Sequence, residues 1–137
     1  MSIMWRLAIL FSLTAITCSP FEAPQRVQTG EWGGEHVGLS VHARGGALEF
    51  DCAHGTIDEA IVAGDDGRFS VKGTYTRERG GPIEKDNPPA SKPARYVGSV
   101  SGGDMNLDVV VENGDNGETI GPFRLRLGDR PRVFKCR

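Results

Sequence analysis

From Gly30 to the C-terminus, apolar and polar residues alternate with a period of two. This pattern is typical of β-strands that bury one face and expose the other. The predicted inward faces are Val37, Leu39 and Val41; Leu48, Phe50 and Cys52; Phe69, Val71, Gly73 and Tyr75; Met105, Leu107, Val109 and Val111; Phe123, Leu125 and Leu127; and Phe134 with Cys136. Weaker strands are expected over 57–62 and 95–101, which gives about eight strands in all.

Glycine-rich turn signals separate these runs. They are Arg44-Gly45-Gly46, Gly64-Asp65-Asp66-Gly67, Gly102-Gly103-Asp104 and Asn113-Gly114-Asp115-Asn116-Gly117. Gly, Asn and Asp supply the positive φ of tight hairpins, so consecutive strands are expected to pair antiparallel. The sequence therefore predicts an all-β, up-and-down meander. We expect it to close into a small barrel rather than a sandwich, because closure buries one face of every strand and removes the exposed edges.

Residues 77–94 interrupt the alternation with four prolines and two adjacent glycines. A connection of this length is uncommon unless it is functional or disordered, and both interpretations stay open. A lid over one end of the barrel is one role for it.

The first seventeen residues have the composition of a signal peptide, expected as a short helix. One positive charge, Arg6, precedes an apolar run over 7–16. That run is shorter than the ~20 residues of a membrane-spanning helix but matches the ~7 to 15 of a secretory apolar region. A buried N-terminal helix is the alternative, although the apolar residues do not form the stripe that such a helix needs.

The end of this leader lacks a good site for general signal peptidase. Cleavage after Ser19 would place Pro20 at the first mature position, and cleavage after Ala23 would place Phe21 three residues before the cut. Ala15-Ile16-Thr17-Cys18 resembles a bacterial lipobox, which implies a lipid on Cys18 and a membrane as partner. By resemblance to Gram-negative lipoproteins, the absence of aspartate after Cys18 implies outer-membrane attachment facing the periplasm. A soluble secreted or periplasmic form is the alternative, and residues 18–29 would be a tether to a domain over 30–137.

Composition narrows the class of function. The chain has 19 glycines, 8 prolines and 25% charged residues, which fits a folded domain rich in turns. Without Arg6, 15 basic and 18 acidic residues remain, and this balance argues against a nucleic-acid partner. A lipid on Cys18 leaves Cys52 and Cys136 to form a disulfide in an oxidising compartment, worth about 4 kcal/mol in the entropic model. Two free buried thiols are the alternative.

Gly30-Glu31-Trp32, followed near the C-terminus by Arg130 and Arg132, resembles the calycin pattern of lipocalins and related barrels. The resemblance implies that Gly30 and Trp32 close the base of the barrel and that Arg132, or Arg130, packs across the indole. The runs 30–36 and 49–55 also resemble a set of uncharacterised bacterial lipoproteins. Ligand stacking on Trp32 is the functional alternative to this structural role.

The remaining polar residues form no catalytic or metal signature. His36, His42 and His54, with Glu35 and Asp51, lack the spacing of zinc ligands, so neither a metal nor another cofactor is expected. Glu49 and Asp51 lie on one strand face, as many solvated carboxylates do, and no nucleophilic serine motif occurs.

Two functions remain after these exclusions. The first is a non-enzymatic envelope protein with a filled barrel that acts by protein–protein interaction, and the bulky predicted interior favours it. The second is a calycin-like barrel that binds a small apolar ligand.

Overall fold

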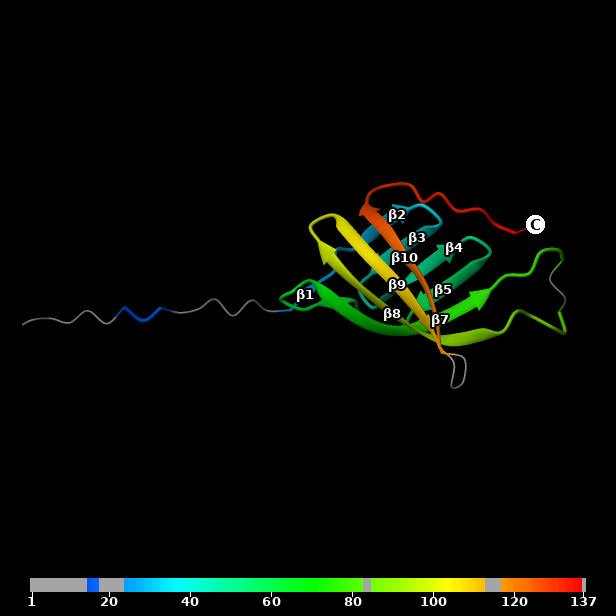
Figure 1. Ribbon diagram of the computed structural model, residues 1–137, viewed down its shortest axis with the longest axis horizontal. Helices are drawn as coiled ribbons and strands as arrows, with labels where there is room; N and C mark the ends of the chain where they lie inside the picture. Colours follow the sequence, from blue (N-terminus) through cyan, green and yellow to red (C-terminus); the bar gives the residue numbers. More distant parts are fainter. Residues whose placement is uncertain (1–14, 18–23, 83–84, 113–116, 137) are drawn as a thin grey trace, which may run out of the picture.

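The computed structural model describes residues 15–17, 24–82, 85–112 and 117–136, and its body is a closed antiparallel barrel (Figure 1). The barrel strands are β2 (Gly30–Gly34), β3 (Val37–His42), β4 (Gly45–Phe50), β5 (Ala53–Ile57), β7 (Arg68–Arg77), β8 (Ser91–Ser101), β9 (Asp104–Val111) and β10 (Glu118–Leu127). Each strand pairs with the next barrel strand along the chain, and β10 returns to β2. The predicted eight-stranded, up-and-down barrel is confirmed.

The identity of the eight strands differs from the prediction. Two-residue turns at Glu35–His36 and Asp51–Cys52 separate β2 from β3 and β4 from β5, and the sequence pattern predicts neither turn. His36 and Cys52 adopt φ values of 67° and 53°, which non-glycine residues rarely do, so the sequence carried no turn signal there. The expected strand over 57–62 is wrong, because β5 ends at Ile57. The expected last strand through Phe134 and Cys136 is also wrong, because the chain after β10 leaves the sheet.

Large apolar side chains fill the interior. Trp32 and Tyr96 are fully buried, and Phe50 packs against Tyr75 and Phe123 with ring centroids 5.6 and 5.3 Å apart. Gly55 is required beneath Tyr96, because a Cβ there would lie 2.1 Å from the tyrosine hydroxyl oxygen. That hydroxyl donates a hydrogen bond to the carbonyl oxygen of Thr74 at 2.6 Å, so the buried polar group is satisfied.

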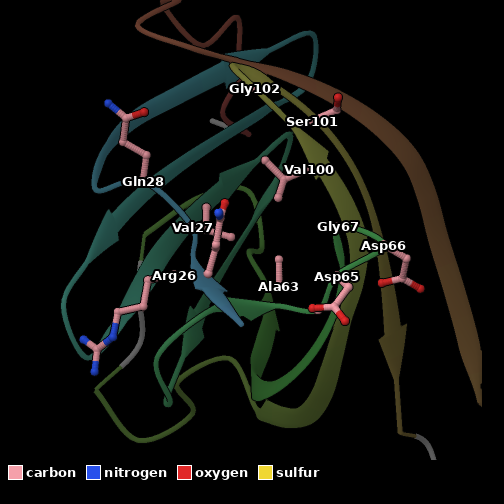
Figure 2. Close-up of a pocket in the computed structure, with 12 residues that line it drawn as sticks. Arg26, Val27, Gln28, Ala63, Asp65, Asp66, Gly67, Val100, Ser101 and Gly102 are labelled. Carbon is pink, nitrogen blue, oxygen red and sulfur yellow. The ribbon is translucent and has the colours of Figure 1, made fainter. Parts of the chain in front are cut away.

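One end of the barrel, which we call the arm end, is covered by the chain before β2. β1 (Gln25–Arg26) pairs with β6 (Val62–Ala63), and the amide of Val27 donates to the carbonyl oxygen of Ile61 at 2.9 Å. Val27 is 5% exposed. The folded body therefore begins within the predicted 18–29 tether, because two backbone pairs and one apolar side chain leave no periodic signal. A pocket of about 550 Å³ opens beside this arm and is bordered by Asp65 and Asp66 (Figure 2).

The long connection is shorter than the predicted 77–94, since β7 continues through Arg77 and β8 begins at Ser91. Pro93 is tolerated inside β8 because of where it lies in the ladder. Its carbonyl oxygen accepts a hydrogen bond from the amide of Glu112 at 2.9 Å, and β9 has already ended at Val111. Pro93 also lacks an N–H on this side, but the side faces the end of the pairing with β9, where the loss of one donor costs the sheet little.

The leader lies mostly outside the described residues, so the expected signal helix is untested. Within the part of the chain that the structure describes, no helix has the length and apolar character needed to span a bilayer.

Candidate functional site

The chain after β10 forms a strap, residues 128–136, that crosses the outside of the barrel. It starts at the arm end, passes over β2 and reaches the opposite end, as the red segment of Figure 1 shows. Backbone hydrogen bonds hold the first part of the strap. The amide of Gly128 donates to the carbonyl oxygen of Glu31 at 2.7 Å, and the amide of Arg132 donates to the carbonyl oxygen of Gly34 at 3.0 Å. The carbonyl oxygen of Arg132 in turn accepts a hydrogen bond from the amide of His36 at 2.8 Å. The strap is thus docked along β2 before it reaches the far end.

Two glycines make this close approach possible. Gly33 and Gly38 are paired across β2 and β3, where Trp32 and Leu39 face inward and these two residues face outward. A Cβ on Gly33 would lie 2.2 Å from the carbonyl oxygen of Asp129, and one on Gly38 would lie 2.7 Å from the Cβ of Pro131. Any side chain at either position would push the strap off the sheet.

A disulfide between Cys52 and Cys136 fastens the far end of the strap. The two residues lie 84 positions apart, with their Cα atoms 4.9 Å from each other. The predicted pairing is confirmed, but the predicted inward orientation is wrong. Cys52 occupies the β4–β5 turn and Cys136 is exposed, because the strap runs over the outside of the barrel.

Asp51 receives the strap one residue before this disulfide. Its Oδ1 accepts a hydrogen bond from the amide of Phe134 at 2.8 Å, and the amide of Cys52 donates to the carbonyl oxygen of Phe134 at 3.3 Å. Nδ1 of His36 lies 2.5 Å from the other carboxylate oxygen of Asp51. The Phe134 amide, and to a lesser degree His36, hold the pKa of Asp51 below its ordinary value.

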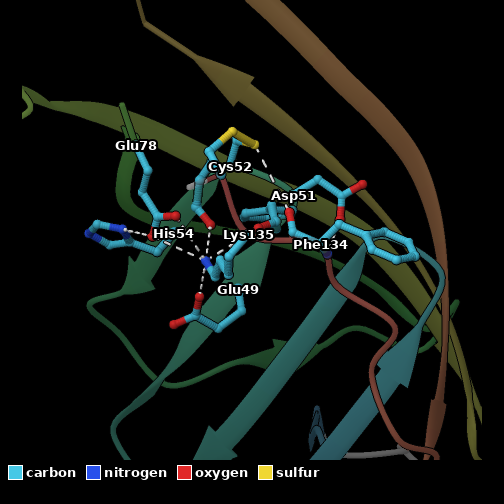
Figure 3. A network of polar contacts seen from close by, with 10 residues as sticks. Glu49, Asp51, Cys52, His54, Glu78, Phe134 and Lys135 are labelled. Atoms are coloured by element: carbon cyan, nitrogen blue, oxygen red, sulfur yellow. Dashed lines mark hydrogen bonds and ion pairs between the residues drawn. A yellow bond between two sulfur atoms is a disulfide. The ribbon is translucent and has the colours of Figure 1, made fainter. Parts of the chain in front are cut away.

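Lys135 joins three elements at the same place (Figure 3). Its Nζ donates to the carbonyl oxygen of Ala53 at 3.0 Å and to Glu78 at 3.1 Å, and it also forms an ion pair with Glu49. Desolvation opposes the charge of Lys135, but the hydrogen bonds that it donates to Glu49 and Glu78 outweigh desolvation and raise its pKa. We call this set the clasp: Glu49, Asp51, Cys52, His54, Glu78, Phe134, Lys135 and Cys136.

Glu78 is the acceptor that links the clasp to the end of β7. Besides Lys135, it contacts Nδ1 of His54 at 3.0 Å. Partial burial pushes the pKa of Glu78 upward, but the hydrogen bonds from Lys135 and His54 outweigh burial and leave it below its ordinary value. The ionised forms of Glu78 and Lys135 are therefore both favoured near neutral pH.

The side chain of Phe134 faces solvent in the middle of this network. It is 70% exposed, although the amide and the carbonyl of the same residue are both hydrogen-bonded. Its ring lies 6.3 Å from the ring of His36. The prediction that Phe134 belongs to the interior is wrong, and the clasp instead holds the backbone that carries this aromatic ring on the surface.

The residues predicted to close the barrel lie on two elements, with Gly30 and Trp32 on β2 and Arg132 on the strap. Trp32 is fully buried and its Nε1 donates to the carbonyl oxygen of Gln28 at 3.0 Å, next to the arm, while Gly30 begins β2 with a φ of 133°. Arg132 forms an ion pair with Glu35 at 3.2 Å, and its side chain is 70% exposed. The barrel-closing role of Gly30 and Trp32 stays a prediction, whereas Arg132 lies at the surface. Cys18 lies outside the described residues.

Three of the histidines and carboxylates considered as chemical groups, Glu49, Asp51 and His54, belong to the clasp. His36 contacts Asp51 and His54 contacts Glu78, while His42 is exposed at the end of β3. Glu49 and Asp51 bind Lys135 and the Phe134 amide rather than facing each other as an acid and a base. Among the described residues, no three potential ligands gather closely enough to hold a metal ion.

Lys135 and Glu78 had not been identified from the sequence. The alternation predicts Lys135 on the outer face of a barrel strand and Glu78 in the proline-rich connection, and neither pattern indicates a long-range ion pair. A search of protein-family models, of curated proteins and of solved structures finds no match to the chain.

Proposed function

We propose that this protein is a non-enzymatic, exported protein of the bacterial cell envelope that binds another protein through its C-terminal strap. The observation that carries the proposal is Phe134, an exposed aromatic residue whose backbone is hydrogen-bonded on both sides within two residues of a disulfide. Aromatic side chains are enriched among the residues that dominate binding energy at interfaces. Fixing such a residue before binding lowers the entropy lost on association.

The packing of the barrel supports this function over ligand storage. Buried apolar residues line the interior from β2 through β10, including Trp32, Tyr96 and Met105. A barrel of eight strands either fills with side chains or holds one small ligand. With side chains inside, the outer surface is what remains for recognition.

A lipid on Cys18 would hold the domain at a membrane by its arm end. Seven peptide units separate Cys18 from Gln25, and a chain of that length spans at most about 25 Å. Because the arm is bound to β6 at one end of the barrel, the clasp at the other end would be directed away from the bilayer. This placement, facing the periplasm from the outer membrane, suits a surface that meets a protein partner.

A photo-crosslinking amino acid at position 134, in the protein expressed in its host, tests the strap as the contact surface. We expect one discrete adduct from position 134 and none from position 97, where Val97 is 36% exposed on the outer sheet. Substitution of Arg132 or Lys135 in the crosslinking variant should weaken that adduct. Equal adducts at 134 and 97, or none at 134, would contradict the proposal.

Membrane anchoring has a separate test. We expect intact-mass measurement of the membrane fraction to find a diacylglycerol-modified Cys18 as the first residue, and Cys18→Ala to release the protein into the soluble fraction. An unmodified N-terminus beyond residue 18 would favour the soluble secreted or periplasmic form and would leave the strap proposal intact.

One observation favours small-molecule binding as a second candidate. A pocket of about 360 Å³ opens at the clasp end, with Tyr75 and Val111 among its lining residues and Arg77 and Glu118 paired at 2.7 Å beside it. It lies at the mouth of the barrel, and five of its nine lining residues are charged. Titration with cis-parinaric acid tests it: saturable fluorescence that Val111→Trp abolishes and Phe134→Ala leaves unchanged would support this candidate.

A further inference from the structure

The barrel closes along only part of β10. Residues 118–126 of β10 pair with β9 or lie in the bulge of that pairing, but only Arg126 and Leu127 pair with β2. β2 ends at Gly34, where a Cβ would lie 1.9 Å from the carbonyl oxygen of Arg124, and the chain then turns away through Glu35 and His36. Among the strands that the structure describes, none flanks residues 118–123 of β10 on this side.

A cleft of about 590 Å³ lies where the two strands part. One wall is the β2–β3 turn with Glu35 and His36, the other is β10, and Asp129 and Arg132 of the strap border it. Pro122 and Phe123 supply apolar surface, and Phe123 is held in place by Phe50. The volume falls within the range of roughly 300–1,000 Å³ that is usual for binding sites.

Three arginines line this cleft, in a chain whose net charge is −2. Arg124 is exposed and forms no ion pair with any described residue. Arg126 pairs with Asp104 and Arg132 with Glu35, both at 3.2 Å, and all four of these side chains are 70 or 71% exposed. Ion pairs this exposed contribute little, so an incoming carboxylate can replace the acidic partner at small cost.

We propose that this cleft binds an extended, carboxylate-rich segment of the partner protein, with one apolar side chain of that segment against Pro122 and Phe123. The inference rests on the proposed function and names the chemistry of the partner. Guanidinium groups bind carboxylates in bidentate pairs, which favours an acidic segment over a basic one. The site is a cleft recessed between two strands, which an extended chain can enter and a flat bilayer cannot. Pro122 lacks an N–H, so side chains rather than a continuous added strand provide the recognition.

The test uses the disulfide-bonded protein and an acetylated, amidated peptide of six glutamates around a central phenylalanine. We expect saturable binding by isothermal titration calorimetry, with amide chemical-shift changes confined to residues 33–36 and 120–126. The double variant Arg124→Glu/Arg132→Glu should weaken binding roughly tenfold or more, because it reverses two charges at the contact. Arg68→Glu is the matched control: Arg68 is 80% exposed, lies outside the cleft, pairs with Asp66, and should leave affinity unchanged.

Three outcomes would overturn the inference: equal binding of the lysine counterpart peptide, equal weakening by Arg68→Glu, or binding only to vesicles of phosphatidylglycerol and phosphatidylcholine. Unchanged thermal unfolding of the double variant confirms that its fold is intact. If position 134 still crosslinks to a partner while the glutamate peptide fails to bind, the strap function stands and the acidic chemistry of the partner is wrong. If the peptide binds but position 134 forms no crosslink, the cleft binds acidic segments and the proposed function of the strap is wrong.

Discussion

The two ends of the barrel are held by different forces. At the arm end, two backbone pairs between β1 and β6 and the buried side chain of Val27 cover the interior. At the clasp end, a disulfide and partly exposed polar groups fasten the strap, with the side chain of Lys135 41% exposed and that of Glu78 27% exposed. The first arrangement protects the core, and the second positions a surface.

This difference follows from what each interaction specifies. Burial of apolar area is non-directional, so Val27 stabilises the arm without fixing a particular geometry. Hydrogen bonds and a disulfide have narrow distance and angle requirements, so the clasp determines where Phe134 stands. Four changes test this division, and they are given from the largest expected effect to the smallest.

Removal of the disulfide by Cys52→Ala/Cys136→Ala should lower the free energy of unfolding by about 2–5 kcal/mol, since the crosslink restricts a long loop of the unfolded chain. The barrel itself should persist, with far-ultraviolet circular dichroism unchanged at 25 °C and faster proteolysis confined to the strap. Urea denaturation measures the loss. A barrel that unfolds outright would show that the clasp holds the core as well as the strap.

Gly38→Val should cost about 1–3 kcal/mol, because the new side chain overlaps Pro131 and forces the strap away from β3. Amide hydrogen exchange should rise at Arg132 and Phe134. Gly103→Ala is the control, because a Cβ there would approach nothing closer than 3.8 Å. Equal destabilisation by the two substitutions would show that the strap does not rest on Gly38.

Val27→Ala should cost about 1–2 kcal/mol through the loss of two buried methyl groups at the arm end. Val62→Ala, in the adjoining strand but 39% exposed, should stay within about 0.5 kcal/mol of the wild type. Thermal unfolding of the two variants separates burial from β-propensity. A larger loss of stability for Val62→Ala would show that β6, and not the buried side chain of Val27, supplies the stabilising contact.

Acidification should weaken the clasp selectively. The pKa values of Asp51 and Glu78 lie below their ordinary values of 3.8 and 4.5, so their stabilising contribution is present above those values and is lost as the pH falls through the folded-state pKa values. Lys135 has a raised pKa and contributes fully below 10.5, so it does not change the loss of stability in acid.

Urea denaturation from pH 6 to pH 3 should therefore show a steeper loss of unfolding free energy in the wild type than in Asp51→Asn/Glu78→Gln. Glu112→Gln, which changes an exposed carboxylate after β9, should follow the wild type. Parallel curves of stability against pH for all three proteins would show that Asp51 and Glu78 do not cause the loss of stability in acid.

The barrel was predictable from sequence because its signal is local. Alternation over five to ten residues assigns faces to strands such as β7 and β9, and glycine-rich turns mark where the chain reverses. The turns at His36 and Cys52 are not predictable because their cause is not local: tertiary contacts with Asp51 and Cys136 accompany the positive φ of these non-glycine residues, and a single sequence shows no sign of such contacts.

The sequence by itself determined an all-β chain, and it predicted closure into about eight antiparallel strands and a pairing of Cys52 with Cys136, with free thiols as the alternative. Only the tertiary structure decided that the last nine described residues lie outside the barrel, that Phe134 faces solvent and that Lys135 meets Glu78 from 57 positions away. The physical reason is that alternation fixes which side of a sheet a residue faces only while the residue stays in the sheet. Whether the chain stays there depends on contacts such as those of Gly33 and Gly38 with the strap, which exist only once the barrel has closed.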